Sequence, residues 1–292
     1  MAAQYRKIPV LRRGIVLSAL MEKRASIIVC GTHGKTTTAA MLVRALRAAR
    51  RAPDYCIGGD APRCAVAGAG REPLMVAEAD ESDGTLAVFA PDIAVITNIE
   101  FDHAEHYADM PALLKCFAQL RAQVKQSIIY CADDSQSARL LARHPRAVSF
   151  GFAQDAEWRA KIVSTTSCST AFAVEHQNRP LGVIKLPVTG THNVLNALAA
   201  CAAASAYGAP FTAIRKGLNG FLPVRRRFEK VFERKGLCVI SDYAHHPTEI
   251  KAGLNSFQHI RSARHRVVFQ PHRYSRTKAM GREFAEILQN LD

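Results

Sequence analysis

The 292-residue sequence lacks any apolar run long enough to span a membrane. Its alanine-rich stretch at residues 197–206 has the pattern of a buried helix instead. The basic N-terminus carries a short apolar run at residues 15–21, but charged residues 22–24 follow at once and no small-residue cleavage site is evident. The sequence therefore predicts neither a membrane anchor nor a signal peptide.

Cysteine pairs are also missing. The eight cysteines are scattered, with no C-x-x-C pair and no regular spacing that would indicate a disulfide framework or a zinc site. Reduced thiols in a cytoplasmic protein are the simplest interpretation, since stable disulfides are rare in that compartment.

Acidic residues are scarce at both ends of the chain, which has a net charge of +14. Residues 1–50 carry +9 and residues 221–292 carry +7, so the middle carries −2. Such basic ends invite a nucleic-acid hypothesis, but no nucleic-acid-binding module is recognisable. Anionic small substrates explain the arginines better. A P-loop ATPase that binds nucleic acid stays open as an alternative and would require salt-sensitive binding.

The middle of the chain alternates strand and helix patterns, which predicts an α/β fold with a mainly parallel sheet and helices on both faces. Residues 161–187 contain short strands without helices, as in a small antiparallel side sheet. Helices are expected at 193–206 and 211–218. The predicted strands of the central sheet are residues 26–30, 74–77, 93–97, 127–131 and 147–150, and the helices between them are 110–124 and 134–143.

The C-terminal pattern predicts a second, incomplete unit. Pro223 and the arginines at 225–227 indicate a domain boundary. Beyond it we expect parallel strands at 237–241 and 267–270, a helix that begins at Pro247 and a last helix from about Lys278. Two parallel strands are too few for an ordinary doubly wound sheet, so residues 223–292 are expected to be weakly ordered or prone to aggregation.

The segment GTHGKTTT, residues 31–38, lies between a predicted buried strand and a predicted helix. This context is that of a phosphate-binding loop, in which glycines admit the phosphates, a lysine meets the β- and γ-phosphates and a hydroxyl faces Mg²⁺. The usual eight-residue loop needs a glycine where this chain has Val29. The shorter G-x-x-G-K-T form argues against an ordinary kinase or GTPase. A glycine-rich turn that binds nothing is the alternative.

Acidic residues follow the strand at 74–77, and Glu100, Asp102 and His103 follow the strand at 93–97. Carboxyl ends of parallel strands meet at one edge of a sheet, so these side chains are expected near the phosphate loop. Glu81 and His103 are the metal candidates, since Mg²⁺ bound with ATP needs only a few protein ligands. Some of these acids could instead cap helices or face solvent.

Three further segments carry candidate residues. Asn193 opens a helix, where it could cap the helix or pair with adenine. Asp242 and the histidine pair at 245–246 follow one strand and precede Pro247. Arg273 and Arg276 follow another, and two arginines on a strand-end loop suit a carboxylate or a phosphate, unless the loop is simply solvated.

Taken together, these motifs resemble those of the Mur ligase family, in the same order and over nearly the whole chain. They are most similar to the branch that joins L-alanine to UDP-N-acetylmuramate, and share several motifs with the branch that attaches recycled tripeptide. The motifs are GTHGKTTT, AEADESDG, TNIEFDHAEHY, GTHNVLNALAA, RRRFE, DYAHHPTEIKA and FQPHRYSRT.

The resemblance implies three domains, of which residues 1–23 would be a remnant of the UDP-binding domain, 24–222 the central ATP domain and 223–292 part of a Rossmann-like C-terminal domain. This implies a chain shortened at both ends, with ATP binding but little turnover on its own. A non-catalytic ATP-binding remnant is therefore the second hypothesis.

The resemblance also implies ATP and Mg²⁺ as cofactors and a reaction through an acyl phosphate. Catalytic roles would fall to Lys35, His103, Arg227, Arg273 and Arg276. Nucleotide would be bound by Gly31, Thr32, His33, Gly34, Lys35, Thr36, Thr37, His192, Asn193, Asn196 and Asp242. The substrates would contact Tyr243, His245, Arg273 and Arg276, and Mg²⁺ would be held by Thr36 with Glu81 and by His103 with Glu81.

Overall fold

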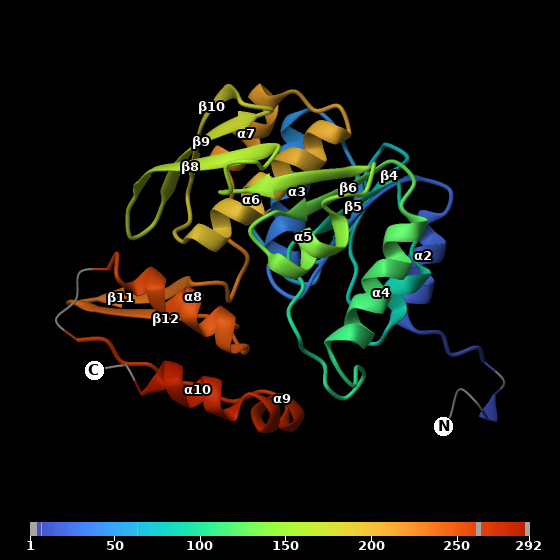
Figure 1. The fold of residues 1–292 in the computed structure, drawn as a ribbon. Coiled ribbons are helices and arrows are strands. Elements are labelled where there is room, and N and C mark those ends of the chain that lie inside the picture. The colour runs from blue at the N-terminus through green and yellow to red at the C-terminus, as the bar shows by residue number, and fades with distance from the viewer. Residues whose placement is uncertain (1–4, 7, 63, 261–263, 290–292) are drawn as a thin grey trace.

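One sheet of ten strands runs through residues 25–186 of the computed structural model, which describes residues 5–6, 8–62, 64–260 and 264–289 (Figure 1). The strand order is β10-β9-β8-β7-β6-β5-β1-β4-β2-β3. All pairs from β2 to β8 in this order are parallel, whereas β8–β9, β9–β10 and β2–β3 are antiparallel. The strands are β1 (Ala25–Cys30), β2 (Asp54–Cys56), β3 (Ala67–Gly68), β4 (Leu74–Glu78), β5 (Ile93–Ile96), β6 (Ser127–Cys131), β7 (Ala147–Gly151), β8 (Trp158–Thr165), β9 (Thr170–His176) and β10 (Arg179–Leu186).

Helices cover both faces of this sheet, as the alternating pattern predicts. Because successive strand residues point to opposite faces, Ile27 and Val29 of β1 join one core cluster and Ile28 and Cys30 join the other. The first cluster packs α3 (Lys35–Ala48), α6 (Thr191–Ala206) and α7 (Phe211–Asn219) on the sheet. The second packs α2 (Arg13–Met21), the 3₁₀ turn η1 (Thr85–Val88), α4 (Met110–Gln123) and α5 (Ser135–Leu141).

Local signals explain where several helices begin. Asp109 caps α4 by accepting a hydrogen bond from the Ala112 amide at 2.8 Å, and a proline occupies the first turn. Asp134 caps α5 in the same way and also accepts from the Ile99 amide at 3.1 Å. The predicted α/β fold class is confirmed. The strands predicted within 161–187 correspond to β8, β9 and β10, which continue the main sheet beyond β7 and do not form a separate side sheet.

The C-terminal segment forms a small unit beside the main sheet, drawn orange to red in Figure 1. It contains β11 (Glu229–Arg234), β12 (Leu237–Ser241), α8 (Pro247–Phe257), α9 (Tyr274–Ala279) and α10 (Gly281–Leu288). The strand at 237–241 and the helix from Pro247 occur where the sequence predicts them.

Three expectations for this segment are wrong. The strand at 237–241 pairs antiparallel with β11 through a tight turn and has no parallel partner in the described residues. Residues 267–270 form no strand, and Val268 is 99% exposed. Two helices, α9 and α10, occur where one was predicted, and α9 begins before Lys278. An apolar run alone predicts a strand only if a neighbouring strand is present to accept its hydrogen bonds.

Within the described residues, no helix is both long and apolar enough to cross a membrane.

Candidate functional site

The loop at residues 31–38 joins β1 to α3, as the phosphate-loop pattern predicts. Gly34 has a φ of +80°, and a Cβ there would lie 2.3 Å from Asn196 Oδ1, so both backbone and neighbour require glycine. Asn98 fixes the loop, because its Oδ1 accepts from the His33 amide at 2.9 Å and its Nδ2 donates to the His33 carbonyl at 3.0 Å. The first amides of α3 have no intrahelical acceptor by position and remain available to an anion.

Lys35 lies at the start of α3 within a group of carboxylates. Its Nζ donates to the two carboxylate oxygens of Glu81 at 3.0 and 3.2 Å and lies 4.0 Å from Asp80 Oδ1. Burial lowers the pKa of Lys35, but Glu81, Asp80 and Glu78 outweigh it and raise the pKa above its ordinary value. Lys35 therefore stays cationic at neutral pH.

The metal candidates Glu81 and His103 come together with Asp80, their ligand atoms all within 4.8 Å of one another. Glu81 is 1% exposed, and burial lowers the pKa of His103, so that its ring is neutral and able to ligate a cation. Glu78, Asp80 and Glu81 surround one lysine, and this excess of negative charge fits a bound divalent cation.

Thr36, the third predicted metal residue, has a different partner in this structure. Its hydroxyl donates to Glu78 Oε2 at 2.8 Å, and the Gly58 amide donates to the same oxygen at 2.7 Å. Glu78 is one of the acids expected near the loop, but no metal or nucleotide role was predicted for it.

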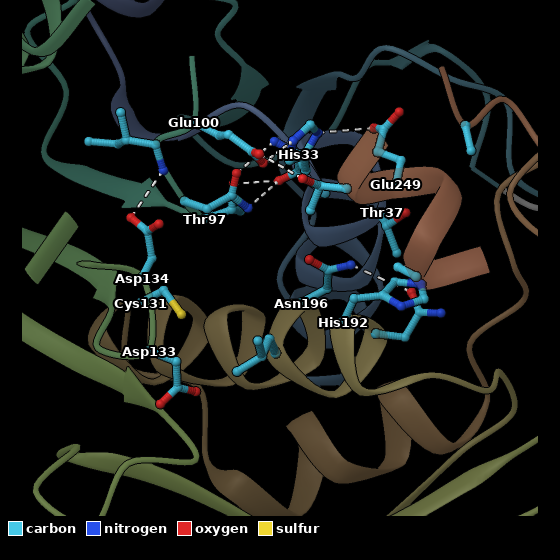
Figure 2. Close-up of a pocket in the computed structure, with 18 of the residues that line it drawn as sticks. His33, Thr37, Thr97, Glu100, Cys131, Asp133, Asp134, His192, Asn196 and Glu249 are labelled. Carbon is cyan, nitrogen blue, oxygen red and sulfur yellow. Dashed lines mark hydrogen bonds and ion pairs between the residues drawn. The ribbon is translucent and has the colours of Figure 1, made fainter. Parts of the chain in front are cut away.

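A cavity of about 500 Å³ opens on one side of the phosphate loop. Figure 2 shows His192 and Asn196 on α6 below His33, with Asp133 and Asp134 across the cavity. Asn193, Asp242 and Arg227 also line it. The predicted adenine-side residues are therefore brought together.

The polar side chains of this cavity are partly engaged already. Thr38 Oγ1 donates to Asn196 Oδ1 at 3.2 Å, and Asn193 Nδ2 donates to the Thr189 carbonyl at 2.7 Å. The N-cap of α6 is Gly190, so Asn193 does not cap the helix. Burial, with a further contribution from Arg227, lowers the pKa of His192 to about 4, so this ring is neutral at pH 7.

A second cavity of about 620 Å³ lies on the other side of the loop. The residues predicted to bind the substrates and those predicted to be catalytic line this same cavity. Four residues, His33, Gly34, Arg227 and Glu249, line both cavities. Its lining includes Thr32, Lys35, Thr36, Asp80, His103, Tyr243, His245, Arg273 and Arg276.

The two predicted arginines of this cavity differ in their surroundings. Arg273 Nη1 lies 3.3 Å from His103 Nδ1, and the guanidinium forms an ion pair with Glu105. Arg276 is almost fully buried and binds Asp102 through two bonds, Nε to Oδ1 at 3.1 Å and Nη2 to Oδ2 at 2.7 Å.

The Arg276–Asp102 pair joins α9 to the residues that follow β5. Burial raises the pKa of Asp102, but Arg276 and neighbouring donors outweigh it and lower the pKa to about 2. The guanidinium of Arg276, which the sequence predicts to bind a substrate, thus binds the carboxylate of Asp102 in this structure.

Arg227 and Tyr243 lie together, as expected of two residues in one site. The guanidinium groups of Arg226 and Arg227 stand 4.6 and 5.5 Å from the centroid of the Tyr243 ring, a cation–π arrangement. Tyr243 also packs edge-on against His245, with centroids 4.9 Å apart. This cluster forms the wall that the C-terminal unit contributes.

Glu249 is a site residue that the sequence reasoning missed, whereas Glu100 was expected near the phosphate loop but was given no role. Glu249 belongs to a capping box in which its carboxylate accepts from the backbone amide of His246, the N-cap of α8. That spacing, a polar N-cap followed three residues later by glutamate, was the signal that could have found it. Glu100 accepts a 2.6 Å bond from the Thr248 hydroxyl.

Two family descriptions match this chain over most of its length. Residues 29–204 match the family description "Mur ligase middle domain", and residues 226–292 match "Mur ligase, glutamate ligase domain". The chain is 40% identical over 295 residues to the UDP-N-acetylmuramate–L-alanine ligase of Geobacter sp. (strain M21), covering 99% of this chain and 64% of the relative. It is 39% identical over 305 residues to the protein of that name in Mycolicibacterium gilvum (strain PYR-GCK), with the same coverage.

Among solved structures, the UDP-N-acetylmuramate-alanine ligase of Thermotoga maritima matches with a TM-score of 0.85 and 29% identity, over 100% of this chain and 66% of that one. A tripeptide-adding ligase, UDP-N-acetylmuramate:L-alanyl-gamma-D-glutamyl-meso-diaminopimelate ligase from Neisseria meningitides, matches with a TM-score of 0.68 and 29% identity, over 77% of this chain and 75% of that one. The chain spans about 64% of the length of the two curated relatives.

Proposed function

We propose that this chain, which belongs to the Mur ligase family, is the ATP-binding and catalytic part of a ligase that joins L-alanine to UDP-N-acetylmuramate in peptidoglycan synthesis. One observation carries the proposal: a phosphate loop with a buried lysine separates a nucleotide-sized cavity from a basic cavity, and the two cavities share the loop as a wall. ATP in the first would present its γ-phosphate to substrates in the second.

The proposed reaction forms an amide in two steps. The muramate carboxylate attacks the γ-phosphorus of ATP, the bond to the bridging oxygen breaks, and ADP leaves. The amine of L-alanine then attacks the carbonyl of the acyl phosphate, loses a proton, and inorganic phosphate leaves. Such chemistry depends mainly on positioning and on neutralising charge.

Lys35 and the amides of the loop would hold the β- and γ-phosphates, since the ammonium is fixed at the start of α3 and stays charged. The loop residues involved would be Gly31, Thr32, His33, Gly34, Thr36 and Thr37. Arg227, which lines both cavities, would reach the phosphates from the C-terminal side. His192, Asn193, Asn196 and Asp242 would surround the adenine.

Thr36 with Glu81, and His103 with Glu81, would hold Mg²⁺. A bound magnesium ion offsets phosphate charge and orients the phosphates for transfer. Thr36 would exchange its bond to Glu78 for this role.

Tyr243, His245 and Arg273 would contact the incoming amino acid and the acyl group, since they line the second cavity beside His103. Arg276 also lines that cavity, but its guanidinium is bound to Asp102, so we assign its main contribution to holding this wall in place.

L-alanine is preferred over tripeptide as the added group because relatives at 39–40% identity carry that name. The solved alanine-adding ligase also superposes better than the tripeptide-adding one. We further propose a cytoplasmic location, which fits eight cysteines that are all free thiols. Proposed unit boundaries are 1–23, 24–222 and 223–292, the last two being the ATP-binding and C-terminal units.

Replacing Glu81 by glutamine tests the metal assignment. The amide keeps the shape of the side chain and a hydrogen-bond acceptor for Lys35 but removes the charge that a cation needs. We expect Mg²⁺ to tighten the binding of ATP to the parent protein. In Glu81→Gln this tightening should be at least roughly tenfold smaller, a loss typical of substitutions around metal sites. Calorimetric titration with ATP, with and without Mg²⁺, measures this.

The matched control is Glu157→Gln, which removes a carboxylate paired with His176 of β9, neither residue lining either cavity. It should leave the Mg²⁺ effect unchanged. An equal Mg²⁺ effect in Glu81→Gln and in the parent would contradict the assignment.

A further inference from the structure

His33 lies between two carboxylates that belong to different parts of the chain. Its Nε2 lies 2.9 Å from Glu100 Oε2 and its Nδ1 lies 3.2 Å from Glu249 Oε1, the latter on α8 of the C-terminal unit. Figure 2 shows the ring bridging the two groups, with a dashed line to each. The imidazole therefore links the phosphate loop directly to the C-terminal unit.

Both ring nitrogens must donate in this arrangement, because an ionised carboxylate only accepts hydrogen bonds. His246 also packs against the ring, with centroids 4.6 Å apart, and Arg227 is a second cation on Glu249, its Nη1 lying 3.7 Å from Glu249 Oε1. Burial lowers the pKa of His33, but Glu100 and Glu249 outweigh it and raise the pKa to about 9. The ring is an imidazolium at neutral pH.

Glu249 carries the link onward to the substrate side. Its Oε2 accepts from the backbone amide of His245 at 3.0 Å, which fixes the segment that holds Tyr243 and His245. A second connection runs in parallel, since Thr248 donates to the carboxylate of Glu100 that also binds His33. The loop, Glu100 and the start of α8 thus form one closed ring of hydrogen bonds.

We propose that His33 is a positioning residue whose doubly bonded imidazolium holds α8 against the phosphate loop, so that a loop in the nucleotide-binding shape places the amine-side residues Tyr243 and His245. The coupling to catalysis rests on the function proposed above, whereas the attachment of α8 does not. By linkage, α8 held in place favours nucleotide binding to the same degree that nucleotide favours α8.

The test compares His33→Gln, which keeps a neutral hydrogen-bonding side chain, with His33→Lys, which keeps a positive charge. Hydrogen–deuterium exchange of residues 245–257 reports the attachment of α8, and titration with Mg-ATP reports the loop. We expect His33→Gln to weaken ATP binding about tenfold, within the range typical of coupled sites, and to lower the protection of α8. His33→Lys should recover part of both. The control is His176→Gln, since His176 forms a similar pair with Glu157 at 3.1 Å and neither residue lines either cavity.

The pH dependence of α8 protection provides a second test, because it should differ between the parent and His33→Lys only if the charge of His33 holds α8 in place. Because the pKa of His33 is raised from 6.5 to about 9, its contribution is complete below about pH 6.5 and is lost as pH rises through 9. Protection of α8 in the parent, corrected for intrinsic exchange, should fall between pH 7 and 10. It should stay nearly level in His33→Lys, whose ammonium remains charged.

Two results would overturn the proposal: exchange of α8 in His33→Gln equal to that in the control, or a pH-dependent loss of protection that persists in His33→Lys. Failure of the parent to bind Mg-ATP would count against the proposed function alone, because the exchange measurements test the attachment of α8 without nucleotide. Unaltered ATP affinity in His33→Gln, together with loosened α8, would overturn the coupling.

Discussion

Replacing Lys35 by alanine is expected to weaken Mg-ATP binding by about 100-fold or more. The Lys35 side chain is only 11% exposed, its ammonium is bonded to Glu81, and the residue is the first of α3. Loss of one partner in a desolvated, hydrogen-bonded charge pair typically costs roughly 3 kcal/mol, which corresponds to about two orders of magnitude. Calorimetric titration of parent and variant with Mg-ATP gives the comparison.

Two further variants make that result interpretable. Lys35→Ala leaves Glu81 buried without its cation, so thermal unfolding must be measured alongside, and Lys35→Arg provides a variant that keeps the charge and the fold. Lys161→Ala removes an exposed lysine that pairs with Glu175 at 2.6 Å on β8 and β9 and should bind ATP as the parent does. Equal titration curves for a folded Lys35→Ala and the parent would show that the loop does not bind phosphate.

Replacing Arg276 by alanine is expected to lower the free energy of unfolding of the C-terminal unit by about 3–5 kcal/mol, the usual cost of leaving one member of a buried ion pair uncompensated. The pair qualifies because Arg276 is 3% and Asp102 7% exposed and the guanidinium binds both carboxylate oxygens. Arg276→Lys should not restore the loss, because lysine lacks the planar fork. Urea unfolding measures the effect.

Arg282→Ala is the matched control, since Arg282 forms an exposed pair with Glu286 at 2.9 Å on neighbouring α10 and should cost less than about 1 kcal/mol. The pH dependence has a defined sign. The lowered pKa of Asp102 means that its contribution is present above about pH 4 and is lost as pH falls through 2. If Arg276→Ala and Arg282→Ala unfold alike, the pair does not anchor α9.

Local sequence patterns were sufficient for the phosphate loop and for β1, β4, β5, β6 and β7 of the central sheet, but not for the short strands β2 and β3. The apolar run that became β1, the glycines at 31 and 34 and the alanine-rich helices carry their own periodicity and backbone requirements. The positions of Lys35 and His103 follow from the sheet, because a parallel sheet brings its strand ends to one rim. His192 and Asn196 lie on α6 and were predicted only through the family resemblance.

Local sequence patterns gave the wrong secondary structure where a pairing strand decides whether a segment forms a strand. Residues 229–234 read as charged and polar, yet they form β11 because a turn at Lys235 and Gly236 brings them against β12. Residues 267–270 read as a strand but have no strand partner in the described part of the chain.

Local sequence patterns also could not predict ion pairs between residues far apart in the chain. His33 and Glu249 are 216 positions apart, and Asp102 and Arg276 are 174 apart. The sequence predicts that Arg276 suits a carboxylate or a phosphate, but it contains no sign that its partner in the fold would be the carboxylate of Asp102. Only the folded chain identifies which charges meet.

The most direct test of the proposed function is ADP release by the protein that carries these 292 residues, with Mg²⁺, ATP, UDP-N-acetylmuramate and either L-alanine or the tripeptide L-alanyl-γ-D-glutamyl-meso-diaminopimelate as the amine. We expect ADP to appear only when UDP-N-acetylmuramate and L-alanine are both present, with the tripeptide supporting little release. ADP release that favours the tripeptide, or none with L-alanine from a protein that binds Mg-ATP, would contradict the proposal.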